Sequence, residues 1–510
     1  MGSNFKPDLH KNVLLISVDT LRFDTVGYES DKTFLMENGK DLGKLIRTPA
    51  IDSLAEKGIV FRRCYTTAPY TTNGHASLLT GCWPHRHGVR SFFVERLSPQ
   101  VKTLSEMFRE SGFRTLHATS FRALFHTGIL GFDRGVEDFI DINRLDHGNG
   151  EMQALKWMES QRASGQRFFA FYHTNFVHDY VYNAVSKDGV SWTPSDVHGE
   201  EKFKRSISLK ELASRYIEAI NLYDQKILGP FLENMIQKGI LDDTIVVFTS
   251  DHGEGLSLKC RTHGWGSRAQ LCEQNLRVPL IFRMPEGIHR TVDTTVRNID
   301  IFPTLSDLCV PDRSDPVDGI SLAPGIEGEP MSSREAYAET WGTIPNGENK
   351  DMISLIQRLG QSKDPERVLR RDAPWVLRAR CLMWGQWKLS RSYDGPPAFK
   401  NDQLYNLIPG HRGHSLLSRY LGPPSWSMEP IKLKWGDFDK TWLLRALRCR
   451  MEEWEKADPY SVKSWLRIGE ELAGGFEASP EDRCRTYSNA VPASEAEPLV
   501  MQLKKMGYID

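Results

Sequence analysis

Two segments that resemble buried strands end in residues able to bind a metal ion. Asp19 directly follows the aliphatic run VLLISV at residues 13–18, and Asp251 with His252 follows TIVVFTS at residues 244–250. Continuous apolar runs of this kind are typical of strands in a parallel sheet, and open α/β sheets bind ligands at the carboxyl ends of such strands. We therefore expect the two carboxylates and the imidazole to converge, where they would suit one divalent cation.

A hydroxyl group lies at the start of a predicted helix in the segment APYTTNGHASLLTG, residues 68–81. Thr71 would stand where free backbone N–H groups and the helix dipole favour an anion, so its hydroxyl could join the groups at the sheet edge. His75 follows by four residues and would share a helix face with Thr71, as a base, a stabilising group or a support for the helix. Considered alone, Thr71 would be an N-cap residue, and an aspartate at a strand end is commonly a cap or turn residue.

The elements that must position these residues alternate between strands and helices. The segment TPAIDSLAEKG, residues 48–58, has proline in its first turn, apolar residues at helical spacing and a final glycine, so it predicts a helix. FFAFY at residues 168–172 predicts another buried strand, and a long amphipathic helix is predicted over about residues 209–238, ended by Gly239. This alternation predicts a doubly wound α/β sheet.

The pattern changes after about residue 340. Residues 343–375 are polar and irregular and predict an insertion or linker. Short strand-like segments at 376–384, 386–392 and 403–407 predict a small antiparallel sheet, and the tail beyond about residue 410, rich in Trp, Arg and Glu, predicts helices. We accordingly divide the chain into a main domain at 1–342, the polar segment at 343–375, a small antiparallel subdomain at 376–412 and a helical extension at 413–510.

The composition argues against several classes of protein. With 40% hydrophobic and 26% charged residues, the 510-residue chain has the balance of a globular protein with a large core. Its net charge of −1 and the absence of a long basic run argue against nucleic acid binding, and no segment approaches the roughly 20 apolar residues of a membrane span. The eight cysteines form no Cys-x-x-Cys pair and the N-terminus lacks a signal-peptide pattern, so we expect reduced cysteines in a cytoplasmic protein. Association into a homo-oligomer stays open.

The chain resembles the sulfatase branch of the alkaline phosphatase superfamily, with matching segments in the same order over about residues 12–410. These segments are NVLLISVDTLR, TPAIDSLAEKGIVFRRCYT, SLLTGCWPHRHGV, DDTIVVFTSDHGEGL, LRVPLIFRMP, NIDIFPTLSDL and QLYNL. The resemblance implies an α/β fold of the alkaline phosphatase-like sandwich type. In that fold a large mixed, mostly parallel sheet is flanked by helices and accompanied by a small C-terminal antiparallel sheet. It also implies that residues 1–342 form the catalytic domain and that Asp19 and Asp251 bind metal.

The segment at the nucleophile departs from the pattern of formylglycine sulfatases. Those enzymes carry Cys-x-Pro-x-Arg, or serine in first place, and oxidise the first residue to formylglycine. Here the corresponding residues are TTNGH, beginning at Thr71, and threonine cannot yield that aldehyde because its β-carbon already bears a methyl group. Cys64 and Cys82 are out of register, and the family's Gly-Lys-Trp-His segment is missing. A formylglycine sulfatase is therefore not expected.

The threonine at this position is similar to that of phosphate-handling members, such as nucleotide pyrophosphatase-like diesterases and lipoteichoic acid synthase-like transferases, and of unclassified threonine-type sulfatase homologues. In such members a metal activates the hydroxyl for attack on phosphorus, which makes Thr71 the implied nucleophile. The Asp-x-x-x-His of dinuclear members is absent between Thr71 and Asp251, and Thr20 replaces a second acid of many sulfatases. The resemblance thus implies one divalent ion, manganese, zinc or calcium. Its implied ligands are Asp19, Thr71, Asp251 and His252.

Three further histidines are candidates for substrate binding or proton transfer. The resemblance places His173 and His178, in FYHTNFVHDY, where family members bind the substrate or protonate its leaving group. His263, in THGWG, lies in the family's segment that follows the metal-binding Asp-His. Each of the three could instead be a core or surface imidazole with ordinary partners.

Other charged side chains are weaker candidates. Lys259 could pair with an anionic substrate, or be an exposed lysine. Arg22 and Arg122 are weaker candidates for a clamp on phosphate, whereas His85 and His87 are expected to be structural.

The interpretation that follows is a metal-dependent hydrolase acting on a small anionic ester. The resemblance implies cleavage of a phosphate diester or phosphonate monoester through a covalent phosphothreonine at Thr71. Three alternatives remain: a transferase that passes the phosphoryl group to an alcohol or amine, a sulfate ester or sulfamate hydrolase, and an inactive binding or scaffold homologue. The intact set of implied metal ligands argues against the last of these.

Overall fold

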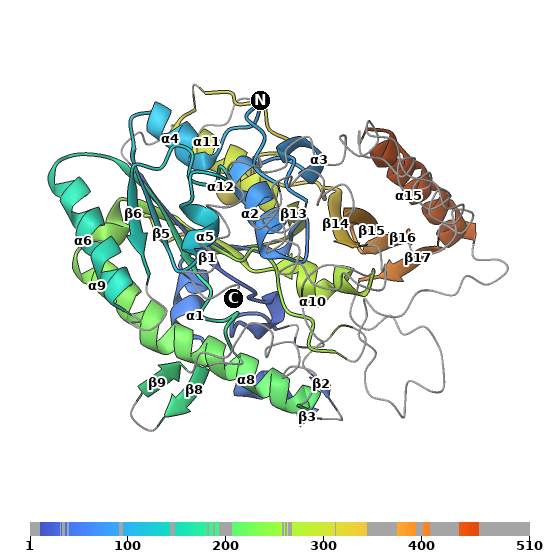
Figure 1. Ribbon diagram of the computed structural model, residues 1–510, viewed down its shortest axis with the longest axis horizontal. Coiled ribbons are helices and arrows are strands. Elements are labelled where there is room, and N and C mark those ends of the chain that lie inside the picture. The colour runs from blue at the N-terminus through green and yellow to red at the C-terminus, as the bar shows by residue number, and fades with distance from the viewer. Residues whose placement is uncertain are drawn as a thin grey trace, which may run out of the picture.

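A nine-stranded sheet lies at the centre of the protein, in the strand order β11-β4-β12-β10-β1-β7-β5-β6, with β13 paired to β4 (Figure 1). The strands are β1 Asn12–Val18, β4 Ile59–Tyr65, β5 Arg114–Thr119, β6 Asp138–Asp141, β7 Phe168–Thr174, β10 Thr244–Thr249, β11 Arg277–Val278, β12 Leu280–Arg283 and β13 Arg290–Arg297. The computed structural model describes residues 11–30, 32, 36–37, 40–90, 95–142, 148–180, 183–186, 189–192, 207–257, 260, 263, 268–311, 313–343, 375–393, 401–407 and 438–457.

The sheet is mixed and mostly parallel, as predicted. The neighbours from β10 through β1, β7 and β5 to β6 are all parallel, and so is the pair β4–β13. Antiparallel pairing is confined to β10–β12, β12–β4 and β4–β11. Every residue of β1, β7 and β10 is buried, which explains why these segments read as continuous apolar runs.

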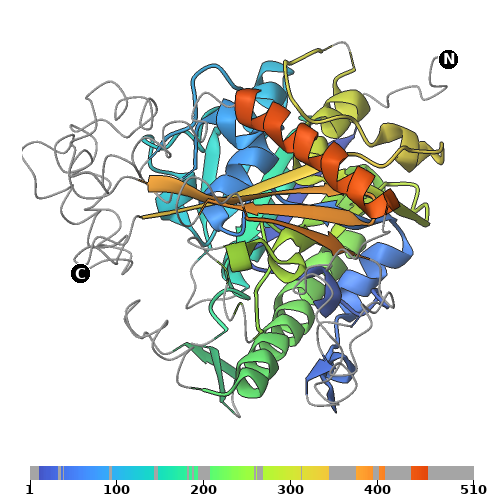
Figure 2. The same ribbon diagram turned by 90° about the vertical axis from the view of Figure 1, so that its right-hand side faces the viewer.

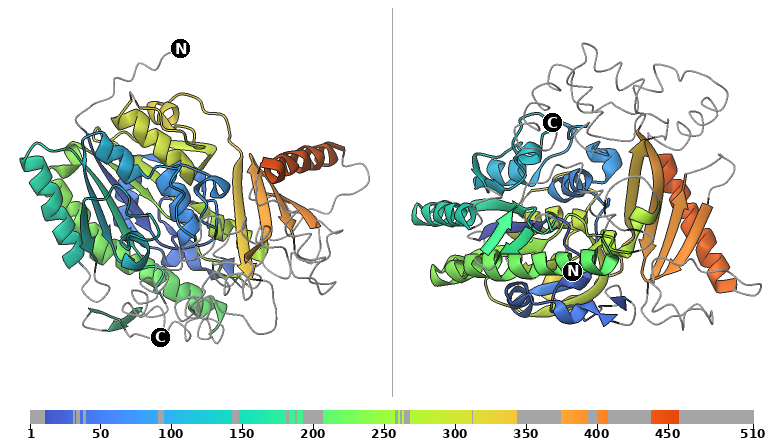
Figure 3. Two further views of the ribbon diagram at one scale, coloured as in Figure 1. Left: turned by 45° about the horizontal axis from the view of Figure 1, so that its top comes forward. Right: turned by 60° about the horizontal axis from the view of Figure 1, so that its bottom comes forward.

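Helices cover both faces of the sheet and make three layers (Figures 1 and 3). Along β1, Val13 and Leu15 face one apolar core, and Leu14 and Ile16 face the other. The first core packs against α2 Thr71–Thr80, α4 Leu104–Glu110, α5 Arg122–Phe125, α11 Ile301–Cys309 and α12 Ala323–Glu327. The second packs against α1 Pro49–Glu56, α6 Asn149–Ala163, α8 Leu209–Leu222 and α9 Gly229–Gln237. The short helices α3 Pro84–His87 and α10 Glu273–Leu276 complete this part of the fold, with single turns at Phe23–Thr25, Leu42–Leu45, Ile240–Asp242, Arg268–Leu271 and Asn298–Asp300.

The predicted long helix at 209–238 is interrupted by a change of helix type. Between α8 and α9 the chain forms a π-helical segment, Tyr223–Leu228, in line with both. Apolar side chains of all three parts belong to the second core, so the amphipathic pattern continues through the segment. The predicted helix at 48–58 is α1, and the predicted strand at 168–172 is the start of β7.

A second sheet lies beside the main one and is antiparallel throughout, as predicted for the C-terminal part (Figures 2 and 3). Its strands are β14 Ala336–Thr343, β15 Trp375–Trp384, β16 Trp387–Ser392 and β17 Asn401–Asn406. One face packs toward the main domain, where Ala338 and Cys381 meet Tyr65. The helix α15 Phe438–Ala457 crosses the other face, with Leu447 and Met451 in the core beneath it.

The edge strand of this small sheet comes from within residues 1–342, so the sheet is not confined to the segment 376–412. The described part of the helical tail is α15, while the remainder of 413–510 and residues 344–374 of the polar segment lie outside the described residues. Two small hairpins, β2 Met36–Glu37 with β3 Lys40–Asp41 and β8 Asn183–Ser186 with β9 Gly189–Trp192, complete the set of strands. Within the described part of the chain, no helix has the length and apolar character needed to cross a bilayer.

Candidate active site

The pairing of β1 with β10 brings the predicted metal ligands together. Ser17 lies opposite Thr249 in the parallel register, so Asp19 and Asp251 each lie two positions beyond this pair. One oxygen of each carboxylate and a ring nitrogen of His252 lie within 4.8 Å of one another, and all three residues are buried. Because the two strands are adjacent and parallel, their carboxyl ends meet at one edge of the sheet, where ligands of such folds bind.

The donor atoms of this cluster fit a divalent cation. One oxygen of Asp251, Oδ1, accepts hydrogen bonds from the backbone N–H groups of Thr20 (3.2 Å) and His252 (2.9 Å). The other oxygen, Oδ2, is buried and accepts none from the described residues. The His252 Nδ1–H donates to the Gly253 carbonyl at 2.8 Å, which leaves the Nε2 lone pair for a metal. Burial lowers the pKa of His252 to about 3, so the ring is neutral, as a metal ligand must be.

The two carboxylates differ in their electrostatic surroundings. Burial raises the pKa of Asp251 well above its usual range, and the neighbouring negative charge of Asp19 raises it further. Burial also raises the pKa of Asp19, but the nearby imidazoles, His173 first among them, outweigh burial and hold the pKa well below its usual range. Two buried carboxylates this close repel each other when both are ionised, and a divalent cation between them would relieve that repulsion.

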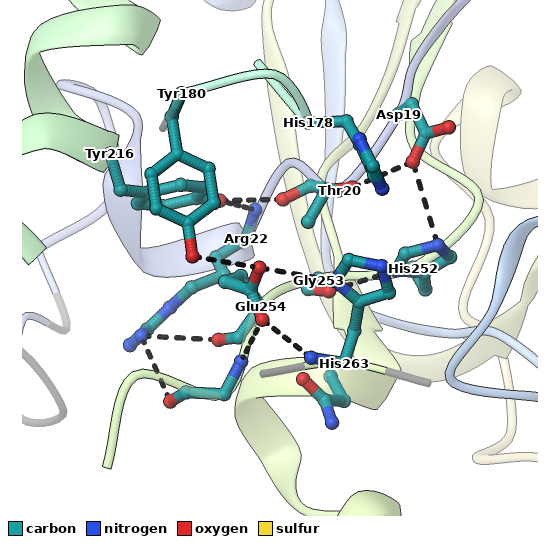
Figure 4. A network of polar contacts seen from close by, with 12 residues as sticks. Asp19, Thr20, Arg22, His178, Tyr180, Tyr216, His252, Gly253, Glu254 and His263 are labelled. Carbon is teal, nitrogen blue, oxygen red and sulfur yellow. Dashed lines mark hydrogen bonds and ion pairs between the residues drawn. The ribbon is translucent and has the colours of Figure 1, made fainter. Parts of the chain in front are cut away.

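Thr20 holds both carboxylates in place, and Figure 4 shows its contact with Asp19. Its hydroxyl donates to Asp19 Oδ1 at 2.6 Å, while its backbone N–H donates to Asp251 Oδ1. Its φ of 68° lies in the left-handed region, which a β-branched residue rarely adopts. The Tyr216 hydroxyl donates to the Thr20 carbonyl at 2.6 Å and accepts from the Arg22 N–H at 3.0 Å, so the surrounding structure stabilises this conformation.

Thr71 is the first residue of α2 and its hydroxyl lies beside the metal cluster. Thr71 Oγ1 is 3.4 Å from Asp19 Oδ2 and 3.3 Å from His252 Nε2. The N-cap position belongs to Tyr70, so the Thr71 side chain is not the cap that its position in the sequence also allowed. The helix reaches this point because Gly74 packs against the strand end: a Cβ at Gly74 would lie 2.6 Å from the Asp251 carbonyl oxygen.

His75 lies behind Thr71 and is buried away from solvent. Its Nε2 is 2.9 Å from Ser17 Oγ, and its Nδ1 is 3.0 Å from the Thr71 carbonyl oxygen and 3.4 Å from Asp251 Oδ2. The ring is completely buried, and burial lowers its pKa well below the usual range. Of the three roles considered for His75, these contacts favour support of the helix start and of Asp251.

The three other candidate histidines also lie around the cluster. His173, on β7, is buried, with Nδ1 2.9 Å from Thr119 Oγ1 and Nε2 3.8 Å from Asp19 Oδ2. The His263 ring centre is 4.6 Å from that of His252 and 5.0 Å from that of His178. The side chains of His178 and His263 are 25% and 13% exposed, so both stand on the open side of the site.

The two weaker arginine candidates are paired with carboxylates other than those of the cluster. Arg22 is buried in an ion pair with Asp24 at 2.6 Å, and Arg122 pairs with Asp141 at 3.9 Å on the surface. Neither arginine is therefore placed as a phosphate clamp. Lys259 lies outside the described residues.

The two histidines expected to be structural have structural contacts. His87 is buried, with Nε2 2.9 Å from Ser77 Oγ and Nδ1 accepting from the Val89 N–H. The His85 ring packs edge-on against Trp454 of α15. None of these contacts involves Asp19, Asp251 or His252.

Glu254 is the main residue of the site that the sequence did not single out. It is fully buried directly beyond the metal ligands, and its Oε2 lies 3.1 Å from His263 Nδ1. The available signal was an acid two positions after Asp251-His252, inside the quoted segment DDTIVVFTSDHGEGL. Its partner His263 lies nine positions further on, so the pairing requires the folded loop.

A three-layer α/β fold with a carboxylate–imidazole cluster and a hydroxyl at the strand ends has the architecture of a metal-dependent ester hydrolase. The chain belongs to the Sulfatase family, whose sequence profile matches residues 11–309, more than half of its length. Members of this family depend on a metal, and Asp19, Asp251 and His252 are the candidate site for it here.

Individual relatives are distant. The ulvan-active sulfatase of Formosa agariphila is 24% identical over 453 residues, covering 80% of this chain and 77% of that protein. The low-salt glycan biosynthesis sulfotransferase of Haloferax volcanii is 27% identical over 338 residues, covering 65% of this chain and 68% of that protein. Among solved structures, the phosphonate monoester hydrolase of Agrobacterium radiobacter superposes with a TM-score of 0.55 at 18% identity, covering 86% of this chain and 95% of that chain. These likenesses support the fold of a sulfatase-family hydrolase and leave its substrate to be proposed.

Proposed function

We propose that this protein hydrolyses a small phosphate diester or phosphonate monoester through a covalent phosphothreonine at Thr71. The observation that carries the proposal is the position of the Thr71 hydroxyl, 3.4 Å from Asp19 Oδ2 and 3.3 Å from His252 Nε2. A divalent cation held by Asp19, Asp251 and His252 would supply the positive charge that lowers the pKa of this hydroxyl and polarises the substrate oxygens. Threonine in this place cannot become formylglycine, which supports the hydroxyl itself as the proposed nucleophile.

The reaction has two balanced steps. The Thr71 hydroxyl loses its proton to solvent, its oxygen forms a bond to phosphorus, and the bond from phosphorus to the leaving oxygen breaks. The leaving oxygen takes a proton from one of the partly exposed imidazoles, His178 or His263. Water then attacks the phosphorus and gives one proton to the same imidazole, the bond from phosphorus to the Thr71 oxygen breaks, and that oxygen regains a proton from solvent.

Phosphorus is favoured over sulfur because of the second step. A formylglycine hydrate can expel sulfate by collapsing to its aldehyde, whereas an ester of Thr71 must be attacked at its central atom. The free backbone N–H groups at the start of α2 would face the equatorial oxygens of a group transferred to Thr71. A sulfate monoester, a phosphate diester and a phosphonate monoester each carry one negative charge, but the sulfate spreads it over three non-bridging oxygens and the other two spread it over two. Each sulfate oxygen therefore carries less charge, and the same groups stabilise its transfer less.

Transfer to an acceptor other than water is the second candidate function. The relative from Haloferax volcanii is named a sulfotransferase, which shows that a protein of similar sequence has been assigned transfer rather than hydrolysis. An alcohol or amine that reached the intermediate would replace water in the second step. Product analysis with added alcohols distinguishes the two, since a transferase forms a new ester and hydrolysis does not.

The test uses esters with one common leaving group: bis(4-nitrophenyl) phosphate, 4-nitrophenyl phenylphosphonate, 4-nitrophenyl phosphate and 4-nitrophenyl sulfate. With metal-loaded protein we expect higher kcat/KM for the diester or phosphonate than for the sulfate. Thr71→Ala should lose at least about 10⁴-fold in kcat/KM, whereas Thr71→Ser, which keeps the hydroxyl, should retain measurable turnover. Mass spectrometry of acid-quenched protein should find the phosphoryl or phosphonyl group on Thr71.

Two results would contradict the proposal. Faster turnover of the sulfate would show that sulfur is the preferred centre. Activity of Thr71→Ala close to that of the unchanged protein, with equal metal content, would show that another group is the nucleophile.

A further inference from the structure

Glu254 lies at the centre of a buried hydrogen-bond network on one side of the site (Figure 4). Its side chain is fully buried. Its Oε1 accepts from the backbone N–H groups of Gly255 (3.0 Å) and His263 (2.5 Å), and its Oε2 accepts from the Tyr180 hydroxyl at 3.2 Å. The fourth contact is with His263 Nδ1, at 3.1 Å from Oε2. Both oxygens are therefore surrounded by donors.

This environment determines the state of the His263 ring. A carboxylate can only accept hydrogen bonds, so the His263 nitrogen that faces Glu254 must carry a proton. The Nδ1–H is thereby fixed, and Nε2 becomes the ring atom at which a proton can be gained or lost. The ring lies between Glu254 on one side and His178 and His252 on the other, at centre distances of 5.0 and 4.6 Å from those two rings. Nε2 is thus on the side of the reaction centre.

We propose that Glu254 is a positioning residue that fixes His263 in the Nδ1–H form, so that Nε2 exchanges a proton with the oxygen opposite Thr71. This inference rests on the proposed function and assigns its proton transfer to His263 rather than His178. In the first step the imidazolium gives its Nε2 proton to the leaving oxygen, and the bond from phosphorus to that oxygen breaks. In the second step Nε2 takes one proton from the attacking water. Glu254 keeps its charge throughout and stabilises the imidazolium.

The loop has other anchors, so Glu254 is not needed merely to hold it. The Arg22 guanidinium donates from Nη1 to the carbonyls of Glu254 (3.3 Å) and Gly255 (3.4 Å), while its Asp24 partner holds the guanidinium. The Gly253 N–H donates to the Asn275 carbonyl at 2.9 Å. These bonds involve the backbone and persist when the Glu254 side chain changes. A variant at Glu254 should therefore fold and report on His263.

Glu254→Gln gives a sharp test because it nearly preserves shape and puts an NH₂ group in the place of Oε2, which contacts both the Tyr180 hydroxyl and His263 Nδ1. The Tyr180 hydroxyl can accept instead of donate, whereas Nδ1 can accept only after losing its proton. The amide NH₂ would face Nδ1, so we expect His263 to change to the Nε2–H form, visible in the ¹⁵N spectrum of histidine-labelled protein with His263→Ala as the assignment reference. Turnover should fall by a factor on the order of 10² in kcat with little change in KM. The loss should be larger for an alkyl leaving group than for 4-nitrophenolate, which needs no proton. Glu254→Gln combined with His263→Ala should be no slower than His263→Ala alone.

The matched control is Glu151→Gln, because Glu151 is another buried glutamate bonded to a tyrosine hydroxyl (Tyr172, 2.7 Å) and a backbone N–H (Gly148, 2.9 Å). We expect it to leave the His263 spectrum and the leaving-group dependence unchanged. An unchanged His263 tautomer in Glu254→Gln, or an equal loss for both leaving groups, would overturn the proposal. The spectrum is recorded without substrate, so failure of the proposed phosphoryl chemistry would appear separately, as an active Thr71→Ala.

Discussion

At the scale of single residues, four consecutive positions provide most of the site. Asp251 and His252 are the candidate metal ligands, the Gly253 carbonyl fixes the tautomer of His252, and the Glu254 carboxylate faces His263. Gly253 cannot be replaced without movement, because a Cβ there would lie 1.9 Å from the Gln274 carbonyl oxygen. The neighbouring residues Gly253 and Glu254 therefore determine which ring nitrogen carries the proton in His252 and in His263.

Asp251→Asn should strongly weaken metal binding without unfolding the protein. An asparagine keeps the oxygen that accepts from Thr20 and His252, and its amide group takes the place of Oδ2, which accepts no hydrogen bond from the described residues. That amide can donate to His252 Nε2, 3.3 Å from Oδ2, and so occupy the lone pair that a metal needs. We expect elemental analysis to find one divalent ion per unchanged chain, and the variant to bind it more weakly by more than the roughly 10- to 100-fold loss typical of outer-shell changes. Two tightly bound ions per chain, or full metal content in the variant, would contradict this.

How far the sequence predicts the site depends on how local each signal is. Asp19, Asp251 and His252 could be found because a buried strand followed by a ligand residue is a continuous pattern, and parallel pairing then decides where they meet. Arg22 was misinterpreted because its type suits phosphate, while its bidentate partner Asp24 becomes evident only in the folded turn. The role of Glu254 could not be predicted, because its contact with His263 nine positions away forms only in the folded chain and follows from no sequence spacing.

At the scale of elements, the π-helical segment gives the long helix a specific contact. Asp224, in this segment, accepts hydrogen bonds from the backbone N–H groups of Ala50 (3.0 Å) and Ile51 (2.8 Å) in the first turn of α1. One helix thus caps another through a buried carboxylate. Hydrophobic periodicity predicted a helix over 209–238 because the apolar stripe continues through all three parts. The change to π-helical geometry at Tyr223–Leu228 does not alter this hydrophobic pattern, so the sequence did not predict it.

Asp224 should make stability depend on pH in an unusual direction. Burial raises its pKa from 3.8 to about 6, against the lowering effect of the two N–H bonds. The folded state therefore holds this proton more tightly than the unfolded state, so its contribution is fully present below about pH 4 and is lost as pH rises through about 6. Relative to Asp224→Asn, which has no such proton, the unchanged protein should lose on the order of 1–3 kcal/mol in free energy of unfolding between pH 4 and pH 7. Urea denaturation of both proteins at several pH values measures this difference, and a difference that did not vary with pH would show the pKa assignment to be wrong.

At the scale of the whole molecule, the active site is held by both the main sheet and elements far along the chain. Tyr216 on α8 supports Thr20, and Asn298 donates to the Gly74 carbonyl of α2 at 3.1 Å. The small sheet takes part as well, since the Glu339 N–H of β14 donates at 2.9 Å to the Thr67 carbonyl just before α2. Fold class and strand positions were predictable from pattern and resemblance, whereas these long-range supports arise only from tertiary packing.

Metal removal should lower the stability of the entire fold. The cation would bind between two buried carboxylates from neighbouring central strands, and the unfolded chain has no such arrangement. With free metal about 100-fold above its Kd, the gain is about 2.7 kcal/mol, which for a chain of this size is on the order of 2–4 °C in Tm. Calorimetry with and without a chelator should show this shift. Asp251→Asn should melt at the same temperature in both conditions, and an equal shift in that variant would mean that the metal acts elsewhere.

The parallel pairing of β1 with β10 also bears on how the protein is made. Thr20 and Asp251, which it joins, lie 231 positions apart. At usual rates of synthesis a ribosome needs roughly 10–50 s to pass from one to the other. During that interval β1 can pair with β7, which emerges earlier, while Asp19 waits for the strand that completes its site. A nascent chain that ends before β10 therefore contains Thr71, His75, His173 and His178 but lacks Asp251 and His252, so it cannot load metal at this centre. Metal capture therefore waits for β10, whose pairing with β1 brings Asp251 and His252 to Asp19.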